Sequence, residues 1–406
     1  MKAIARRVTA TAIAKEGGEA ERKAAINLAR RGESSAAVRG ALTLAGTEQE
    51  IVVTPDDLDA DPLLLNCANG VLDLRTGQLG LHDPKLLLTK MTTAAYRPGA
   101  AGPEWRKFLE RVQPDPAMRD YLARLTGHSL DGRQVEHVLP INFGPGANGK
   151  GTYVRAIFAA LGDYAAPADP ELLTARTFDA HPTGVADLFG LRLAVLHESD
   201  RGRLLAEGTV KRLTGGDRQK ARRMREGFWW FDPSHTFLML TNHKPIMTGT
   251  DEGIWRRIKL VPWDVVIPAE ERDLGLDDRL ALEIDAVLAW LADGYRDWRD
   301  RGLDDPDPVT LATAAYRAES DALGRFLAER CMRHGRVRSS ELFTAWSRWC
   351  IGEGEEPGTQ TAFSTALVNR GFDKRTTNVG VMWTGISLER DGDELRVSEG
   401  SEGSIG

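Results

Sequence analysis

Short hydrophobic runs and glycine-bearing polar turns alternate through the middle of the chain. Residues 138–143, 191–196 and 236–240 are each apolar at all but one position, and these runs have strand length and are too short for typical helices. Between the first two runs, residues 152–161 have the spacing of a helix. Strands that alternate with helices are typical of an α/β domain built on a parallel sheet. We therefore expect an α/β core over residues 136–303.

The chain before this core has a different pattern. Residues 1–50 are rich in Ala, Arg and Glu and predict helices that are interrupted at glycines. Asn-Gly and Thr-Gly pairs within 64–84 predict a small β-meander. Residues 104–130 return to helical spacing. We expect 1–135 to form a mostly helical N-terminal domain that serves as an oligomerisation collar.

The chain after the core predicts a second, smaller domain. Residues 279–302 predict one strongly periodic helix, and the Asp- and Pro-rich run 304–308 predicts a linker. Within 309–390, three short helical patterns precede a strand-like hairpin, an order typical of a winged-helix domain. The tail 391–406 is rich in Gly, Ser and Glu, which predicts disorder.

A glycine-rich turn separates the first apolar run from the helix that follows it. Its sequence fits the GxxxxGK pattern of a phosphate-binding loop, in which backbone N–H groups surround an anion. The lysine supplies a positive charge for the β- and γ-phosphates, and the helix N-terminus adds its dipole. We therefore expect an ATP site. Its nucleotide-binding residues would be Gly144, Pro145, Gly146, Ala147, Asn148, Gly149, Lys150, Gly151 and Thr152.

Polar side chains that follow the next two strands complete the expected site. Gly151 stands where a hydroxyl residue normally binds Mg²⁺, so we expect Thr152 to take that role. Glu198 and Asp200 follow the second strand, where a P-loop fold places the acid that holds the metal or polarises water. Asn242 follows the third strand and is placed to sense the γ-phosphate. The expected metal ligands are thus Thr152, Glu198 and Asp200.

The charge distribution points to local rather than overall contact with nucleic acid. The formal net charge is −6, but 208–225 holds seven Lys and Arg residues against one Asp. Such a cluster fits a phosphate backbone, whereas an exposed charge run alone is more often only solvated. The expected DNA-binding residues are Lys211, Arg218, Lys220, Arg222 and Arg223. Lys374 and Arg375, near the C-terminal hairpin, are also placed to meet phosphate.

Two further motifs each allow two interpretations. The aromatic run 228–231 follows the basic cluster and could stack on bases, but a buried strand is the favoured interpretation. The pair Arg256 and Arg257 follows a glycine turn. These arginines are either part of a structural salt bridge or fingers that reach the ATP of a neighbouring subunit.

Composition limits the class of protein. Apolar residues make up 42% of the chain, and no apolar run approaches the roughly 20 residues of a membrane span. Three widely spaced cysteines argue against a disulfide framework and a zinc site. We expect a cytoplasmic protein with no membrane partner.

The order of these motifs resembles that of superfamily 3 helicases of the phage, plasmid and poxvirus-type primase–helicase group. The matching segments are 69–77, 144–152, 211–217, 241–245 and 253–258, together with Glu198. The resemblance implies an AAA+-like P-loop ATPase, usually a hexameric ring, that uses ATP and Mg²⁺ to move 3′→5′ on single-stranded DNA. It implies a role in the replication of a phage, prophage or plasmid, with single-stranded or forked DNA as the partner.

The same resemblance implies roles for individual residues. Lys150 and Thr152 would bind nucleotide and Mg²⁺, Glu198 would be the Walker B acid, and Asn242 the sensor. The basic cluster would belong to a hairpin in the central channel. Arg257 would be the arginine finger, with Arg256 as the alternative.

The chain also departs from the family pattern. Gly151 replaces a hydroxyl residue, and the acids are separated by a serine instead of adjacent. Too few residues precede the meander for a primase domain, so we expect the helicase portion alone, with any priming supplied by a separate protein. Two alternatives stay open: an initiator that uses ATP only to assemble at an origin, and a small-molecule kinase, because some such kinases share the Gly-Lys-Gly-Thr loop.

Overall fold

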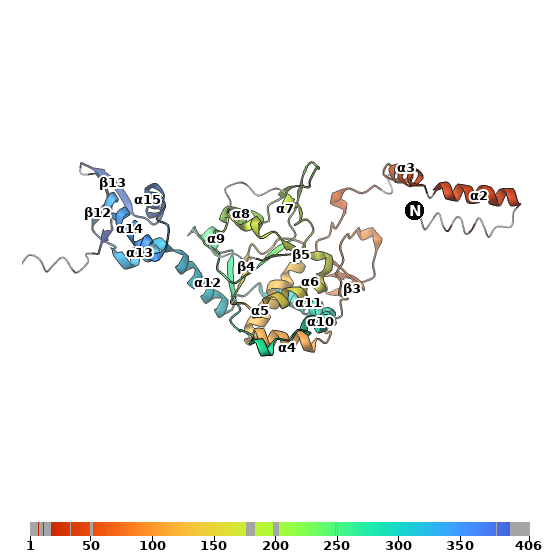
Figure 1. Ribbon diagram of the computed structural model, residues 1–406, viewed down its shortest axis with the longest axis horizontal. Coiled ribbons are helices and arrows are strands. Elements are labelled where there is room, and N and C mark those ends of the chain that lie inside the picture. Colours follow the sequence, from red (N-terminus) through yellow and green to blue (C-terminus); the bar gives the residue numbers. More distant parts are fainter. Residues whose placement is uncertain are drawn as a thin grey trace, which may run out of the picture. The chain divides into compact units, whose positions relative to one another are not determined.

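The computed structural model describes most of the chain (Figure 1). The described residues are 7, 11, 18–32, 34–48, 52–175, 183–197, 203–247, 249, 251–378 and 380–389. They fall into two compact units. One comprises residues 1–61 and 83–89, and the other comprises 62–82 and 90–406.

The first unit is helical over most of its described length. Helix α2 covers Glu19–Gly32 and α3 covers Ser35–Ala45, in agreement with the predicted helices interrupted at glycines. The Ser34 hydroxyl caps α3 by accepting a hydrogen bond from the Ala37 N–H. Two 3₁₀ turns, Pro55–Asp57 and Pro84–Leu86, complete the unit. Helix α3 buries no residue, so its leucines remain exposed.

A five-stranded parallel sheet forms the centre of the second unit. Its strands are β4 (Leu139–Phe143), β5 (Ala165–Ala168), β6 (Leu193–His197), β9 (Thr236–Thr241) and β10 (Ile258–Pro262). Their order across the sheet is β10-β4-β9-β6-β5, and each pair is parallel. The carboxyl ends of all five strands therefore meet at one edge, with β4 between β10 and β9. This confirms the predicted α/β core.

Alternate residues of the strands pack into two hydrophobic layers. In β9, Leu238 and Leu240 join a cluster with α4 (Pro103–Val112), α5 (Pro116–Gly127), α6 (Lys150–Leu161) and α11 (Ile284–Arg301). Phe237 and Met239 join the opposite cluster with α8 (Glu207–Leu213) and α9 (Glu252–Trp255). The sheet is thus buried on both faces, as its continuous apolar runs require.

The predicted meander is present and is part of this core. Strands β1 (Leu64–Cys67), β2 (Gly70–Asp73) and β3 (Gln78–Gly80) pair antiparallel in that order. Leu65 and Leu72 are buried in the same cluster as α4 and α5. The meander therefore belongs with the α/β core rather than with the N-terminal helices.

The region after β10 differs from prediction in two ways. The predicted helix 279–302 is two helices, α10 (Leu276–Ala281) and α11, separated at Leu282 and Glu283. The predicted linker 304–308 runs into helix α12 (Asp307–Ser320), which packs against β10. The Leu260 N–H donates to the Thr313 hydroxyl at 2.9 Å. No described helix is long and apolar enough to cross a membrane.

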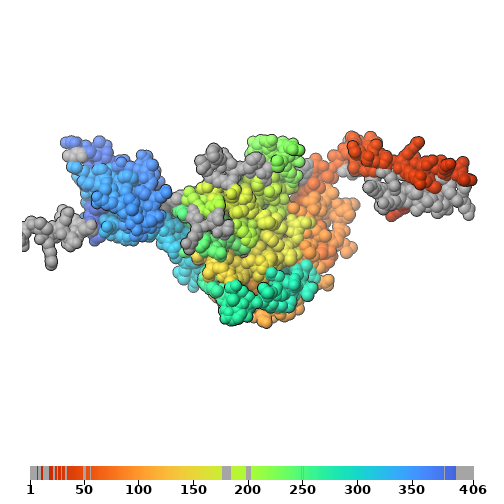
Figure 2. Space-filling model, in the orientation of Figure 1, coloured from red at the N-terminus to blue at the C-terminus, as the bar shows by residue number. Residues whose placement is uncertain are grey.

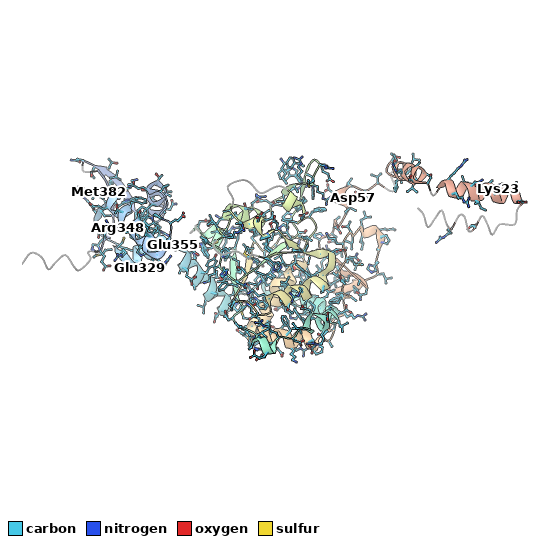
Figure 3. The ribbon with its side chains drawn as sticks, viewed as in Figure 1. Lys23, Asp57, Glu329, Arg348, Glu355 and Met382 are labelled. Atoms are coloured by element: carbon cyan, nitrogen blue, oxygen red, sulfur yellow. The ribbon has the colours of Figure 1, made fainter. Side chains whose placement is uncertain are left out.

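The C-terminal region has its own hydrophobic core. Helices α13 (Ala322–Arg330), α14 (Ser339–Glu353) and α15 (Gln360–Asn369) surround the aromatic side chains Phe326, Trp346, Trp349 and Phe363. Strands β12 (Arg336–Arg338), β14 (Gly380–Thr384) and β13 (Asp373–Thr377) form an antiparallel sheet. At its surface, Trp349 donates to Glu329 and Arg325 pairs with Glu355; both glutamates are labelled in Figure 3.

Candidate functional site

The glycine-rich loop connects β4 to α6 at the carboxyl edge of the sheet. Gly149 has φ +86°, and a Cβ added there would lie 2.5 Å from Val112 Cγ1. At Gly144 a Cβ would lie 2.2 Å from the Trp263 carbonyl oxygen. The Asn148 amide fixes the loop from the other side by donating to the same Trp263 oxygen at 2.9 Å. The loop is therefore held close to the backbone that follows β10, where only glycine fits.

Lys150, the first residue of α6, extends its side chain back along this loop. It is 6% exposed, and its Nζ donates to the Gly144 carbonyl at 2.6 Å and the Asn242 Oδ1 at 3.2 Å. Burial lowers the pKa of Lys150 to about 8. Its partners in the described part of the chain are uncharged oxygens. A buried ammonium without a carboxylate beside a helix N-terminus is an environment that fits an anion.

Thr152 lies one residue beyond Gly151 in the first turn of α6. Its hydroxyl accepts a hydrogen bond from Arg155 at 2.9 Å, and Arg155 pairs with Asp277 at 2.9 Å. Glu198 and Asp200, the other expected metal ligands, lie outside the described residues. Strand β6 ends at His197, in register with Leu240 of β9. The predicted metal ligands thus stay predictions, with Thr152 engaged by an arginine in this structure.

A pocket of about 640 Å³ adjoins the loop. Ala147, Gly149 and Thr152 form one side of it, and Phe108, Ile267 and Leu276 supply apolar surface. Charged side chains, among them Lys107 and Arg272, stand at the same pocket. Its volume and mixed lining are typical of a small-molecule site. Phe108 and Ile267 were not predicted, because a single apolar residue in a helix or loop carries no pattern that marks a ligand contact.

The two predicted finger arginines occupy different environments. Arg257 is 7% exposed, and its guanidinium donates to the Gly253 carbonyl at 2.6 Å and the Thr214 hydroxyl at 3.2 Å. Arg256, by contrast, is exposed. Both precede β10, so they lie at the amino edge of the sheet, opposite the loop that follows β4. The structure thus gives Arg257 a packing role and leaves Arg256 available to another molecule.

The basic cluster forms a hairpin. Strands β7 (Gln219–Arg222) and β8 (Phe228–Phe231) pair antiparallel, with Lys220 opposite Trp230. In Figure 2 this segment, in green, stands out from the surface of the unit. The structure separates the expected DNA-binding residues into those that pair with a carboxylate and those that do not. Lys211 pairs with Asp251 at 2.8 Å and Arg218 with Asp232 at 3.3 Å, whereas Lys220, Arg222 and Arg223 have no carboxylate partner in the described residues.

Aromatic side chains share the exposed face of this hairpin. Phe228 is 54% exposed and Trp230 56% exposed, while Phe231 is buried. Lys220 Nζ lies 4.6 Å from the Phe228 ring centre and 5.9 Å from that of Trp230. The favoured prediction of a buried strand was therefore wrong for these two residues, because a two-stranded ribbon is covered on one face only.

Two family models match the chain. The family described as "D5 N terminal like" matches residues 1–114, and a family of unknown function matches 142–257. The second match covers the glycine-rich loop, β6, the hairpin and β9.

Curated viral proteins are similar over much of the chain. "Putative helicase L207/L206" of Acanthamoeba polyphaga mimivirus is 28% identical over 300 residues, which are 68% of this chain and 31% of that protein. "Putative primase C962R" of African swine fever virus is 23% identical over 72% of this chain and 34% of its own length. The chain thus spans about a third of the length of these relatives.

Among solved structures, the C-terminal region of NrS-1 aligns with 74% of this chain and 80% of its own length. The TM-score of this alignment is 0.45 and the sequence identity is 11%.

Proposed function

Because the chain belongs to the D5-type primase–helicase family, we propose that it is an ATP-driven DNA helicase that serves the replication of a phage, prophage or plasmid. The observation that carries the proposal is the contact of Lys150 with Asn242 at the carboxyl edge of the parallel sheet, where Lys150 Nζ lies 3.2 Å from Asn242 Oδ1. Open α/β sheets bind ligands at this edge. A lysine from one strand–helix turn and an amide from a neighbouring strand there fit a triphosphate.

In this proposal the turn 144–152 is a P-loop. Its backbone N–H groups and the start of α6 surround the β- and γ-phosphates, and Lys150 turns from the Gly144 carbonyl to bind them. Asn242 then contacts the γ-phosphate. Thr152 and Glu198 would hold Mg²⁺, which supplies neutralising charge on the transferred phosphoryl group. The Arg155 contact of the Thr152 hydroxyl must open for that.

The adjoining pocket takes the base. Phe108 and Ile267 offer apolar surface to a flat ring, and the pocket reaches the loop through Gly149. A nucleotide whose phosphates lie on the loop can thus extend its base into this volume. Adenine is the base that we propose.

The β7–β8 hairpin holds the single strand. Lys220, Arg222 and Arg223 lack carboxylate partners in the described chain, so their charge is available to phosphates. Phe228 and Trp230 offer exposed rings for stacking, which is tolerant of sequence. A hairpin that combines these cations with exposed rings is suited to binding and releasing a single strand of any sequence.

Arg256 is proposed to act on the nucleotide of a neighbouring subunit. It lies before β10, and the five-residue strands separate it from the loop edge by about 16 Å. It therefore cannot reach the phosphates of its own subunit. A finger role for Arg256 therefore requires a neighbouring subunit, and we propose that the subunits form a hexameric ring that moves 3′→5′ on single-stranded DNA. Exposed Leu42 and Leu44 on α3 support the N-terminal unit as an oligomerisation collar.

The C-terminal region is proposed to be a winged-helix domain. Three helices and the three-stranded antiparallel sheet β12-β14-β13 support this assignment. Priming is proposed to come from a separate protein or segment.

The test combines two assays on the full chain. ATP hydrolysis should require Mg²⁺ and rise when single-stranded DNA is added, and a forked duplex should be unwound. Lys150→Ala should abolish both activities, and Thr152→Ala should impair hydrolysis across a Mg²⁺ titration. DNA-stimulated hydrolysis without unwinding would instead indicate an initiator that only assembles. Phosphoryl transfer to a small molecule without DNA stimulation would indicate a kinase.

A further inference from the structure

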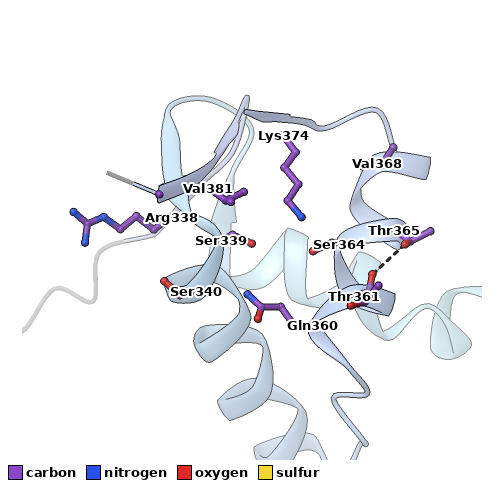
Figure 4. A pocket seen from close by; sticks show the side chains of 11 residues that line it. Arg338, Ser339, Ser340, Gln360, Thr361, Ser364, Thr365, Val368, Lys374 and Val381 are labelled. Atoms are coloured by element: carbon purple, nitrogen blue, oxygen red, sulfur yellow. Dashed lines mark hydrogen bonds between the residues drawn. The ribbon is translucent and has the colours of Figure 1, made fainter. Parts of the chain in front are cut away.

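A pocket of about 700 Å³ lies in the C-terminal domain (Figure 4), and none of the described residues that line it also lines the pocket beside the glycine-rich loop. The start of α14, helix α15 and strands β13 and β14 line it. In Figure 4 the Lys374 side chain extends from β13 into the space between Ser339 and Ser364. None of its described lining residues is acidic. The pocket is therefore positive and rich in hydroxyl groups.

Two hydroxyls in the pocket have hydrogen-bonding capacity that the chain leaves unused. Ser364 is 8% exposed, and its hydroxyl has no partner in the described residues. Ser339 is 6% exposed and accepts from the Trp383 indole N–H at 3.3 Å, which leaves the Ser339 proton to donate. The Ser364 hydroxyl lies on the wall of the pocket, where its full hydrogen-bonding capacity is available to a ligand. Its position in an open pocket indicates a polar ligand.

The positive charge of the pocket comes from two sources. Lys374 has no carboxylate partner in the described chain, and its Nζ lies 5.6 Å from the centre of the Trp383 ring. The 15-residue helix α14 begins at Ser339, and Arg338 at its N-cap makes no side-chain capping bond. The free N–H groups of the first turn thus face the pocket from one side and the ammonium from another. An anion with several acceptor oxygens matches this arrangement.

We propose that this pocket binds a phosphate group of the backbone of duplex DNA. A phosphodiester oxygen would accept from Lys374 Nζ, from the Ser339 and Ser364 hydroxyls and from the first turn of α14. Three exposed residues of α15 that line the same pocket, Gln360, Thr361 and Thr365, are polar and uncharged, which allows the helix to contact a groove of the duplex. The site is separate from the β7–β8 hairpin and does not depend on ATP.

The test uses the full chain and a short blunt-ended DNA duplex, with binding followed by fluorescence anisotropy over a salt titration. Lys374→Gln should weaken binding about tenfold and flatten the log–log salt slope by about 0.9, the value for one duplex phosphate contact. Ser364→Ala should weaken binding several-fold with no change in slope. Arg375→Gln is the matched control. The sequence places both Lys374 and Arg375 near phosphate, but Arg375, the next residue of β13, does not line the pocket. Its substitution removes the same charge and should leave affinity and slope near those of the parent.

The outcomes separate this proposal from its rivals and from the proposed function. Equal losses for Lys374→Gln and Arg375→Gln would overturn it in favour of diffuse surface charge. Unchanged duplex binding in both pocket variants would also overturn it. If calorimetry shows that Lys374→Gln loses inorganic phosphate while duplex affinity is unchanged, the ligand is a free phosphate instead of DNA. ATP hydrolysis stimulated by single-stranded DNA should be normal in all three variants. Failure of the proposal for this pocket would therefore leave the proposed helicase function unaffected.

Discussion

The loop after β4 and the β7–β8 hairpin both present positive charge, but they do so in opposite environments. Lys150 is 6% exposed, and fixed backbone oxygens and an amide surround it. Lys220 and Arg222 are exposed and lie over aromatic rings. A desolvated cation in a rigid loop can recognise one ligand in one geometry. Solvated cations on a ribbon attract any phosphate chain and lose strength with salt.

The same division separates the two neighbouring arginines. Arg257 is buried and satisfied by Gly253 and Thr214, while Arg256 is exposed. Arg256→Ala should bind ATP nearly as the parent does but hydrolyse it about 10³–10⁵-fold more slowly, because the transferred phosphoryl loses its compensating charge. Arg257→Ala should instead lower thermal stability, since the buried Thr214 hydroxyl and the partly buried Gly253 carbonyl lose their donor. Nucleotide binding, single-turnover hydrolysis and thermal melting measure the three quantities.

Mixing experiments sharpen the Arg256 prediction. Rings of Arg256→Ala and Lys150→Ala subunits should recover part of the activity, because some interfaces pair an intact loop with an intact arginine. Confirmed subunit exchange without recovery would count against action between subunits.

Removing the positive charges of the β7–β8 hairpin tests the other half of this comparison. Replacing Lys220, Arg222 and Arg223 by Ala should flatten the salt dependence of single-strand binding by about 0.7 for each phosphate that is no longer neutralised. DNA-stimulated hydrolysis should disappear while basal hydrolysis stays. Arg218→Ala is the matched control, because Arg218 already pairs with Asp232 and its removal should barely change the slope. Salt slopes that are the same in both proteins would make the cluster an ordinary solvated surface.

The aromatic rings of the hairpin should contribute independently of salt. Trp230→Ala should cost about 1–3 kcal/mol in binding to single-stranded DNA, the usual contribution of one stacked base. The salt slope should not change, because no charge is removed. Met224→Ala, at another exposed position of the same hairpin, should have little effect. Equal losses for the two variants would indicate that the hairpin structure, and not stacking, was disturbed.

The pH dependence of nucleotide binding should report the buried lysine. Burial lowers the pKa of free Lys150 to about 8, and a bound phosphate would raise it again. Affinity should therefore be constant below pH 8 and fall by up to about tenfold per pH unit as the pH rises above 8, since binding then requires uptake of a proton. Lys150→Arg keeps its charge throughout and should remove this dependence, which calorimetry in buffers of different ionisation enthalpy can measure. A pH-independent affinity in the parent protein would show that Lys150 stays protonated without ligand.

Several elements could be predicted because a local pattern determines them. The apolar runs of β4, β6 and β9 are buried on both faces, so sequence shows them clearly. Strand β5 is Ala-Ala-Pro-Ala, a composition with low strand propensity, and only its pairing with β6 makes it a strand. Helix α12 has few large apolar residues, and its opening Asp-Pro looked like a linker. Proline in the first turn is in fact a helix-start signal, so that element was available to sequence reasoning.

The candidate site was predictable only in part for a similar reason. The positions of Lys150 and Asn242 after two strands follow from the alternating pattern, but the distance between them depends on strand order. The difference between Arg256 and Arg257 depends on which side of the chain faces Thr214, a residue more than forty positions earlier. The exposure of Trp230 depends on β8 being in a ribbon and not in the main sheet. Each of these features depends on the tertiary structure and leaves no pattern in the local sequence.

The contact between α12 and β10 has a consequence for how copies of the chain can associate. An unpaired strand edge is a template on which another chain can add by backbone hydrogen bonds. The outward N–H of Leu260 in β10 is already taken by Thr313, and α12 lies along that edge. The opposite edge is the four-residue β5, in which Pro167 has no N–H to offer. Both margins of the sheet are thus poor templates for strand addition, which guards against fibrous aggregation and leaves assembly of the chain to side-chain contacts.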